Sequence, residues 1–179
     1  MNEFARWCPE IRAVRFHGPK PDRAAFVRDV LKPGASRRDY DVVVTTYEVA
    51  NAEQKSLEKV SWRFVVIDEA HRIKNEASLF ARTARSLRAE RRLLVTGTPL
   101  QNNLHELWAL LNFLLPDVFA SSDQFDEWFD LDVDDDDAKK TMISQLHKLL
   151  RPFVLRRLKA DVERSMPPKT ETILFASLT

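Results

Sequence analysis

An apolar run, Phe64-Val65-Val66-Ile67, leads directly into Asp68-Glu69-Ala70-His71. Four consecutive apolar residues, three of them β-branched, are typical of a strand in the interior of a sheet. In an open parallel sheet, ligands bind at the carboxyl ends of the strands. The two adjacent carboxylates therefore stand where a functional site is expected.

The flanking sequence alternates between strand and helix signals. Strands are expected over 13–16, 42–46, 63–67 and 92–96, the second of them buried on both faces. Asp22 is expected to cap a helix that stops at Pro33-Gly34. A second helix is indicated by apolar residues at helical spacing, namely Ala77, Phe80, Ala84 and Leu87. Each strand-helix-strand passage is long enough for a right-handed crossover, so the pattern predicts an α/β fold with a parallel sheet.

Helices dominate from residue 103 onward. The expected elements are helices over 104–115, around 125–129 and around 142–150, and a strand over 172–175. Ser121 and Gln124 have the spacing of a capping box ahead of the second of these helices. The aspartate-rich stretch 130–137 is predicted to be a solvated loop, because its charges would repel one another in a packed element.

Charge and composition exclude several classes of function. The 28 basic and 27 acidic side chains give a formal net charge of +1, so any nucleic acid or acidic membrane must be held by local patches. Cys8 is the single cysteine, which excludes an internal disulfide and fits a reducing compartment. The N-terminus lacks a secretory signal and the apolar runs are too short to cross a bilayer. The chain is therefore expected to be neither exported by that route nor membrane-spanning.

Glycine is scarce. Gly18, Gly34 and Gly97 are the three glycines of the chain, and none of them is followed by lysine. Neither of the common glycine-rich phosphate loops, G-x-x-x-x-G-K-[ST] and G-x-G-x-x-G, occurs in this sequence. A nucleotide site built from these residues would therefore lack its phosphate loop.

Asp68 and Glu69 suit phosphoryl-transfer chemistry. Asp68 would hold Mg²⁺, which prefers one or two carboxylates and keeps several waters. Glu69 would orient the water that attacks the terminal phosphate. The alternative is an acidic helix cap after a core strand, and the dipeptide alone does not decide between the two.

Thr96-Gly97-Thr98 follows the next expected strand. If the two strands are neighbours, Thr96 and Thr98 come within reach of Asp68, His71 or the phosphate, and nucleotide state would reposition the turn. The alternative is a plain turn in which Gly97 supplies unusual dihedrals and a threonine or asparagine caps the next helix.

Several motifs in order resemble the Swi/Snf-type branch of the superfamily 2 helicase-like ATPases, which are double-stranded DNA translocases with two RecA-like lobes. The central ones are Asp68-Glu69-Ala70-His71-Arg72-Ile73-Lys74-Asn75 and Thr96-Gly97-Thr98-Pro99-Leu100-Gln101-Asn102. Further matches are Thr45-Thr46-Tyr47-Glu48, the segment 150–163 and Pro167-Pro168-Lys169. Segments 23–31 and 111–119 resemble the imitation-switch (ISWI) class of nucleosome remodellers, so the resemblance spans nearly the whole chain.

The resemblance implies a role for each motif. Asp68 and Glu69 match the Walker B pair of a DEAH box, catalytic in ATP hydrolysis, with Asp68 as the Mg²⁺ ligand. The residues expected to bind the nucleotide are Asp68, Thr96 and Gln101. His71 and Thr98 would couple the carboxylates to the motif that runs from Thr96 to Gln101.

Two other groups of residues match the family's DNA-facing and inter-lobe segments. Thr45, Thr46 and Tyr47 match a first-lobe motif that lies along the DNA backbone, where hydroxyls and amides position phosphates; packing and capping at a strand end is the alternative. Arg156, Arg157 and Lys159 fall in the segment that leads into the second lobe. Their role would be conformational or DNA-binding, and the alternative is a solvated basic helix face.

The resemblance also divides the chain and implies a function. Residues 1–103 match the later part of the first RecA-like lobe, 104–165 a helical protrusion with the inter-lobe segment, and 166–179 the start of the second lobe. The fold is thus predicted to be an incomplete RecA-like lobe without the phosphate-loop strand and helix. The implied function is that of a fragment of a nuclear, ATP- and Mg²⁺-dependent chromatin remodeller, which slides nucleosomes along double-stranded DNA as a subunit of a complex.

Two alternatives remain at this point. The chain is either a non-catalytic module that binds DNA or a partner, or the unstable product of an incomplete gene model. The sequence upstream of Met1 separates the first from an enzyme, and a cooperative thermal transition would argue against the second. Because the phosphate loop is missing, the isolated chain is expected to show no DNA-stimulated ATPase activity.

Overall fold

The structure is a computed structural model that describes residues 1–33, 38–97, 104–129, 141, 144–146, 148–163, 165, 167 and 169–172. The chain divides into two compact units, Met1–Trp128 and Phe129–Thr179. All described strands belong to the first unit. None of the described helices has the length and apolar character that crossing a bilayer requires.

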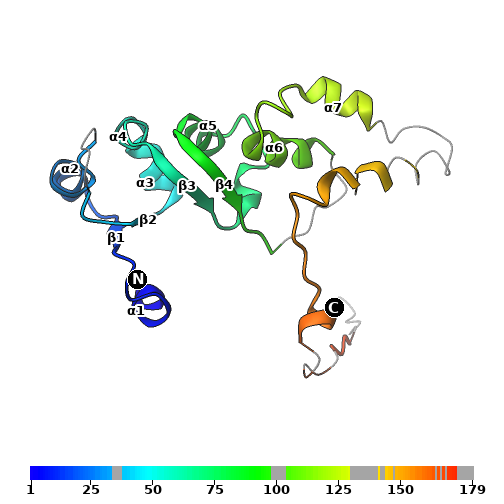
Figure 1. The fold of residues 1–179 in the computed structure, drawn as a ribbon, viewed down its shortest axis with the longest axis horizontal. Helices are drawn as coiled ribbons and strands as arrows, with labels where there is room; N and C mark the ends of the chain where they lie inside the picture. Colours follow the sequence, from blue (N-terminus) through cyan, green and yellow to red (C-terminus); the bar gives the residue numbers. More distant parts are fainter. Residues whose placement is uncertain are drawn as a thin grey trace, which may run out of the picture. The chain divides into compact units, whose positions relative to one another are not determined.

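The described strands form two parallel pairs (Figure 1). Strand β1 (Ala13–Phe16) pairs with β2 (Val42–Thr45), and β3 (Trp62–Ile67) pairs with β4 (Ala89–Leu94). Helix α2 (Lys20–Phe26) connects the first pair and α5 (Leu79–Ser86) connects the second. The predicted α/β fold with crossover helices is therefore confirmed.

The remaining helices link and flank these pairs. Between β2 and β3 lie α3 (Tyr47–Ala52) and α4 (Gln54–Leu57), and the 3-10 turn η2 (Ala70–Ile73) follows β3. The other described helices are α1 (Asn2–Trp7), α6 (Leu104–Leu114), α7 (Ser122–Trp128) and α9 (Lys159–Val162). At the start of α7 the backbone N–H of Gln124 donates to Ser121 Oγ over 3.3 Å, so the predicted cap is present.

Two strand predictions need correction. Strand β4 begins at Ala89, three residues before the expected start, because Ala89 is the register partner of Trp62 and the N–H of Trp62 donates to the carbonyl of Arg88. Strand β2 is not buried on both faces, since Val44 is 37% exposed. Val43 packs on the core whereas Val44, on the opposite face of the strand, points away from it.

The first crossover helix also differs from its prediction. Helix α2 begins at Lys20 with Pro19 as its N-cap, and Asp22 lies in its first turn instead of capping it. Pro21 explains the earlier start, because its fixed φ and missing N–H suit the first turn of a helix. The helix continues as a π-helix, η1 (Val27–Leu31), and ends at Lys32, which has a left-handed φ of 44°.

Among the described residues, two hydrophobic clusters pack against the strand pairs of the first unit. The first cluster consists of Phe16, Leu31, Tyr40, Val49, Ala50, Leu57 and Val60, and the second of Ile67, Ile73, Ala81, Ala84 and Phe113. The second cluster joins the end of β3 and the turn η2 to helices α5 and α6, which lie beside β4 in Figure 1. The carboxyl ends of β3 and β4 thus rest on a packed core.

The second unit is described only in part. Residues 144–146 and 148–150 are helical, within the helix predicted around 142–150. The predicted aspartate loop at 130–137 lies outside the described residues, as do residues 173–175 of the last predicted strand. The domain boundaries expected at residues 103 and 165 stay predictions.

Candidate functional site

The ends of β3 and β4 lie side by side. Ile67 is the register partner of Leu94, and beyond the strands the N–H of Val95 donates to the carbonyl of Ile67 over 2.9 Å. The N–H of Ala70 donates in turn to the carbonyl of Val95 over 2.9 Å. The condition set by the sequence, that the two strands be neighbours, is met, and Thr96 directly follows Val95, whose carbonyl is bonded to Ala70, the residue after the two carboxylates.

Glu69 occupies an unusual backbone conformation. Its φ of 50° and ψ of 56° lie in the left-handed region, which costs a non-glycine residue about 1–2 kcal/mol. The N–H of Glu69 donates to Oδ1 of Asp68 over 2.9 Å, and both side chains are exposed. Such strained residues persist where the surroundings hold them, and they cluster at functional sites.

His71 extends this group. Its Nδ1 lies 3.3 Å from Oε2 of Glu69, and both side chains are exposed. The flanking residues Ala70 and Ile73 are fully buried, so η2 is anchored while His71 faces solvent. The expected coupling of His71 to the threonine motif stays a prediction, since Thr98 and Gln101 lie outside the described residues.

The side chains at the carboxyl end of β3 offer few ligands for a magnesium ion. Within the described ranges, no three His, Cys, Asp or Glu side chains gather as a protein-only metal cage would need. Mg²⁺ does not need such a cage, because it takes one or two carboxylates and completes its shell with water and phosphate oxygens. The exposed carboxylate of Asp68 at the strand end fits that requirement.

The segment that follows the carboxylates contacts helix α6 through Lys74 and Glu76. Lys74 Nζ lies 2.7 Å from Oε2 of Glu106, and His105 Nε2 lies 3.1 Å from both carboxylate oxygens of Glu76. Hydrogen bonds from its own backbone N–H and from His105 hold the pKa of Glu76 below its ordinary value. Helix α6, expected only as part of a protrusion, therefore also supports the carboxylate segment.

The three hydroxyl groups at the end of β2, those of Thr45, Thr46 and Tyr47, all make contacts within the protein. Thr45 Oγ1 donates to the carbonyl of Phe16 over 2.9 Å, and Thr46 Oγ1 accepts from the N–H of Val49 and caps α3. The phenol of Tyr47 donates to the backbone carbonyl of Asp68. The packing and capping roles considered for Thr45 and Thr46 are thus present, while their contact with DNA stays a prediction.

Sequence reasoning missed the partners of Tyr47. The guanidinium of Arg72 lies 5.3 Å from the centre of the Tyr47 ring, and Arg72 Nη2 lies 3.8 Å from Oε1 of Glu48. The ring of Phe80 packs against the same tyrosine at 4.5 Å between centroids. These residues come from three separate elements, so no spacing in the sequence could have signalled the contacts.

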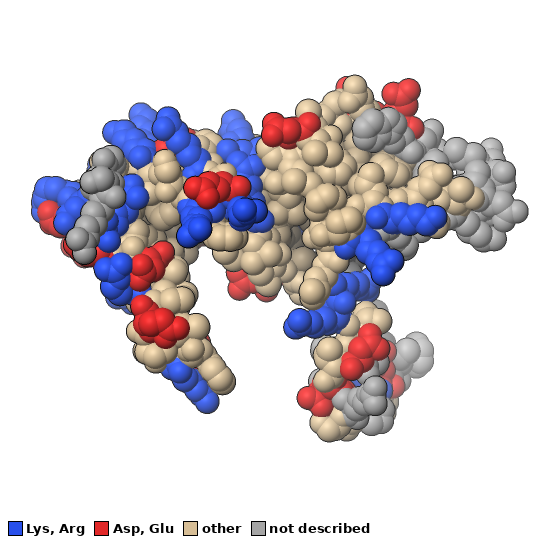
Figure 2. All heavy atoms as spheres, in the orientation of Figure 1, with Lys and Arg blue, Asp and Glu red and all other residues tan. Residues whose placement is uncertain are grey.

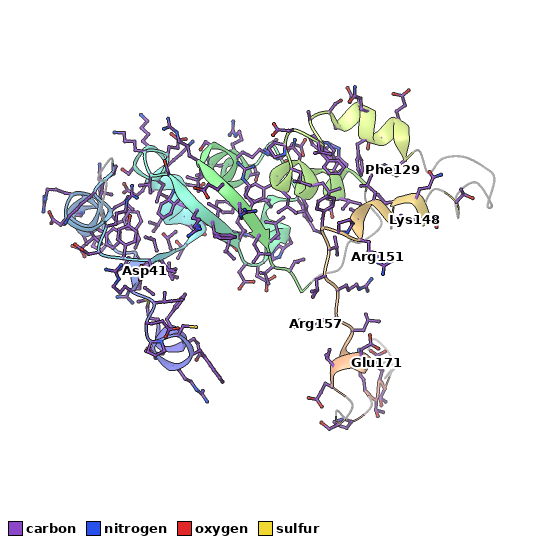
Figure 3. All side chains as sticks on the ribbon, viewed as in Figure 1. Asp41, Phe129, Lys148, Arg151, Arg157 and Glu171 are labelled. Carbon is purple, nitrogen blue, oxygen red and sulfur yellow. The ribbon has the colours of Figure 1, made fainter. Side chains whose placement is uncertain are left out.

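Arg156 and Arg157 of the second unit are exposed. Arg156 and Arg157 lie in the extended segment 154–158 that precedes α9, where Figure 3 labels Arg157, and not on a helix. On the face drawn in Figure 2, basic and acidic side chains are interspersed over the first unit, consistent with the net charge of +1. A conformational or DNA-binding role for Arg156, Arg157 and Lys159 stays a prediction.

Parallel strands joined by crossover helices, with the sequence Asp68-Glu69-Ala70-His71 directly after β3, define a partial RecA-like lobe of the helicase-like class. Residues 1–179 match the SNF2-related domain, and the chain belongs to that family. It is also similar to the solved structure of the Sulfolobus solfataricus SWI2/SNF2 ATPase core in complex with dsDNA. The TM-score is 0.70 at 31% identity, over 90% of this chain and 31% of that chain. The predicted RecA-like fold is therefore confirmed, as part of such a core.

The curated relatives are chromatin remodellers. The chain is 54% identical over 179 residues to the ISWI chromatin-remodeling complex ATPase CHR11 of Arabidopsis thaliana, covering 100% of this chain and 16% of that protein. It is also 54% identical over 179 residues to the human SWI/SNF-related matrix-associated actin-dependent regulator of chromatin subfamily A member 1, covering 100% of this chain and 17% of that protein. With the yeast ISW2 ATPase it shares 49% identity over 177 residues, 99% of this chain and 15% of that protein. The chain thus spans about one sixth of the length of these relatives.

Proposed function

We propose that this chain contributes part of the first RecA-like lobe to an ATP-dependent, ISWI-type chromatin remodeller that translocates along double-stranded DNA. The pairing of β3 with β4, which continues to the bond between the N–H of Ala70 and the carbonyl of Val95, is the observation that supports this proposal. Two of the relatives are named ISWI chromatin-remodeling complex ATPases, and the similar SWI2/SNF2 ATPase core was solved in complex with dsDNA. Nucleosomes as substrate, a complex of subunits and a nuclear location belong to the same proposal.

In this function the two carboxylates have separate roles. Asp68 would hold the Mg²⁺ that accompanies ATP, and Glu69 would orient and deprotonate the attacking water. Mg²⁺-bound ATP supplies the phosphoryl group, and a phosphate loop outside this chain would hold it. Thr96 and Gln101 would contact the nucleotide, while His71 and Thr98 would report its state to the turn after β4.

DNA contact is assigned to the end of β2. Thr45 and Thr46 are exposed there and would lie along the phosphate backbone without reading bases. Tyr47 is half-buried and its phenol is bonded within the protein, so it would lie behind the contact surface. Binding through a few backbone contacts agrees with the small net charge of the chain, +1.

The test uses the full-length protein that contains this chain. Glu69→Gln is expected to keep ATP and DNA binding but to lower DNA-stimulated hydrolysis at least about 100-fold, and with it nucleosome sliding. Glu90→Gln, which changes an exposed glutamate at the opposite end of the same strand pair, is the matched control and is expected to hydrolyse ATP normally. Unchanged hydrolysis in Glu69→Gln would overturn the assignment of the general base.

A further inference from the structure

We propose that Tyr47, held by Arg72, is a positioning residue that couples the DNA-facing end of β2 to the carboxylate of Glu69. The inference rests on the proposed function and deepens it, because it states how DNA contact at Thr45 and Thr46 reaches the hydrolytic site. It starts from the hydrogen bond between the phenol of Tyr47 and the carbonyl of Asp68, which joins two segments 21 residues apart.

The peptide group between Asp68 and Glu69 is held at both ends. Its carbonyl accepts from the phenol of Tyr47, and its N–H donates to Oδ1 of Asp68 over 2.9 Å. Rotation of this peptide plane changes the φ of Glu69, which stands at 50° in a sparsely allowed region. The phenol therefore helps to fix the direction in which the carboxylate of Glu69 leaves the backbone.

Two further contacts hold the tyrosine ring. The ring of Phe80 on α5 packs against it with an interplanar angle of 55°, and Tyr47 is packed on the second hydrophobic cluster. The guanidinium of Arg72, in η2, lies 5.3 Å from the ring centre and reaches toward Glu48 at 3.8 Å. Tyr47, the first residue of α3, is thus held by Phe80 of α5 on the one hand and by Arg72 of η2 on the other.

The position of Tyr47 in the chain makes it a mechanical link. It follows Thr46 directly and is the first residue of α3, so a phosphate that moves Thr45 or Thr46 also moves the phenol. The displacement reaches the peptide between Asp68 and Glu69 through one hydrogen bond. Because coupling between two sites is reciprocal, a change at Glu69 on ATP binding alters the DNA-contacting segment as well.

The experiment compares two tyrosine substitutions in the full-length protein. Tyr47→Phe keeps the ring and removes the phenol. It is expected to lower the DNA-stimulated kcat about fivefold, the effect of one lost hydrogen bond, while the Kd for DNA and the KM for ATP stay within about twofold. Tyr40→Phe is the matched control, since Tyr40 also donates its hydroxyl to a backbone carbonyl, that of Leu31, over 3.2 Å in the first hydrophobic cluster.

A second readout separates coupling from a loss of packing. Hydrogen–deuterium exchange of peptides that span residues 68–72 is expected to change when DNA is added to the wild type and to Tyr40→Phe, but not to Tyr47→Phe. An Arg72→Lys change, which removes the planar group over the ring, is expected to lower kcat and to be non-additive with Tyr47→Phe.

Three outcomes would overturn the link. They are an unchanged kcat in Tyr47→Phe, an equal loss in Tyr40→Phe, and a rise in the Kd for DNA that accounts for the whole loss, which would make Tyr47 a direct DNA contact. Failure of the proposed function is distinguishable from failure of the link. It would appear as normal ATP hydrolysis by the Glu69→Gln variant, independently of the kcat measured for Tyr47→Phe.

Discussion

Ala70 donates its backbone N–H to the carbonyl of Val95 over 2.9 Å, and this bond continues the β3–β4 pairing beyond the end of both strands. Glu69 lies between Ile67, the last residue of β3, and this bond. The left-handed conformation of Glu69 is therefore imposed by main-chain pairing on both sides of the residue. The strain of Glu69 therefore follows from the hydrogen bond that joins the segment after β3 to the segment after β4.

The first prediction concerns that strain. Glu69→Gly is expected to be more stable than Glu69→Ala by about 1 kcal/mol, because glycine adopts a left-handed φ without a Cβ clash while alanine does not. Both variants remove the carboxylate, so their difference isolates the backbone. Urea unfolding followed by circular dichroism measures it.

The same pair of substitutions at Glu90 provides the control. Glu90 lies within β4 and is not among the residues of positive φ, so there alanine is expected to be the more stable replacement. The same order of stability at both positions would show that Glu69 is not strained.

The second prediction concerns a half-buried arginine under helix α6. Arg92 Nη1 donates to the carbonyl of Phe113 over 2.6 Å, and the guanidinium lies 5.0 Å from the centre of the Phe113 ring. Burial lowers the pKa of Arg92. Phe113 lies in the last turn of α6, where carbonyls lack helical partners, so Arg92→Lys is expected to lower the free energy of unfolding by about 1–2 kcal/mol.

The neighbouring Arg91→Lys tests whether this loss is specific. Arg91 is exposed on the opposite face of the same strand, and its replacement is expected to change the stability by less than about 0.5 kcal/mol. Equal effects of the two substitutions in thermal unfolding would contradict the role given to Arg92.

Much of this fold is predictable from local patterns. The strand over 13–16 coincides with β1, and the apolar helix face from 104 onward coincides with α6, because each pattern agrees with the core that the element faces. The early start of β4 was not predictable from a segment as polar as Ala89-Glu90-Arg91-Arg92. Its strand conformation depends on pairing with β3, which begins at Trp62.

The candidate site also has one part that could be predicted from the sequence and one part that could not. Asp68 and Glu69 are recognisable because a strand end followed by two carboxylates is a local signal. The link through Tyr47 and Arg72 depends on three elements that meet only in the folded chain, and the φ of Glu69 depends on the bond between Ala70 and Val95. The sequence therefore indicated candidate residues for the site, whereas their positions relative to one another depend on the fold.

The third prediction concerns stability in acid, and it rests on Arg12 and Asp41, which directly precede the paired strands β1 and β2. Figure 3 labels Asp41. Arg12 donates to Asp41 from its backbone N–H over 2.9 Å, from Nε over 3.0 Å and from Nη2 over 2.9 Å. These bonds lower the pKa of Asp41 from its ordinary value of 3.8 to about 2. Because the folded pKa is the lower one, the stabilisation is complete above about pH 4 and is lost as the pH falls toward 2.

Asp41→Asn is therefore expected to lower stability at neutral pH and to flatten the loss of stability between about pH 4 and pH 2. Chemical unfolding at a series of pH values, followed by circular dichroism, measures this slope. Asp126→Asn, which changes an exposed aspartate on α7, is the matched control and is expected to keep the slope of the wild type. A wild-type slope in Asp41→Asn would contradict the prediction.

The fourth prediction concerns one face of the β3–β4 pair. Phe64, Val66, Leu93 and Val95 alternate on that face and are between 46% and 58% exposed. The opposite face, which carries Val65, Ile67 and Leu94, is packed in the second hydrophobic cluster with residues of α5 and α6.

An exposed apolar face such as that of Phe64 and Leu93 favours association, so the purified 179-residue chain is expected to self-associate as its concentration rises. Phe64→Thr combined with Leu93→Thr introduces β-branched polar residues, which favour strands, and is expected to shift the chain toward monomer, as measured by size-exclusion chromatography with light scattering. Val118→Thr, at an apolar residue that is 60% exposed but lies away from the sheet, is expected to leave association unchanged. A chain that stays monomeric at every concentration would show that this face does not drive association.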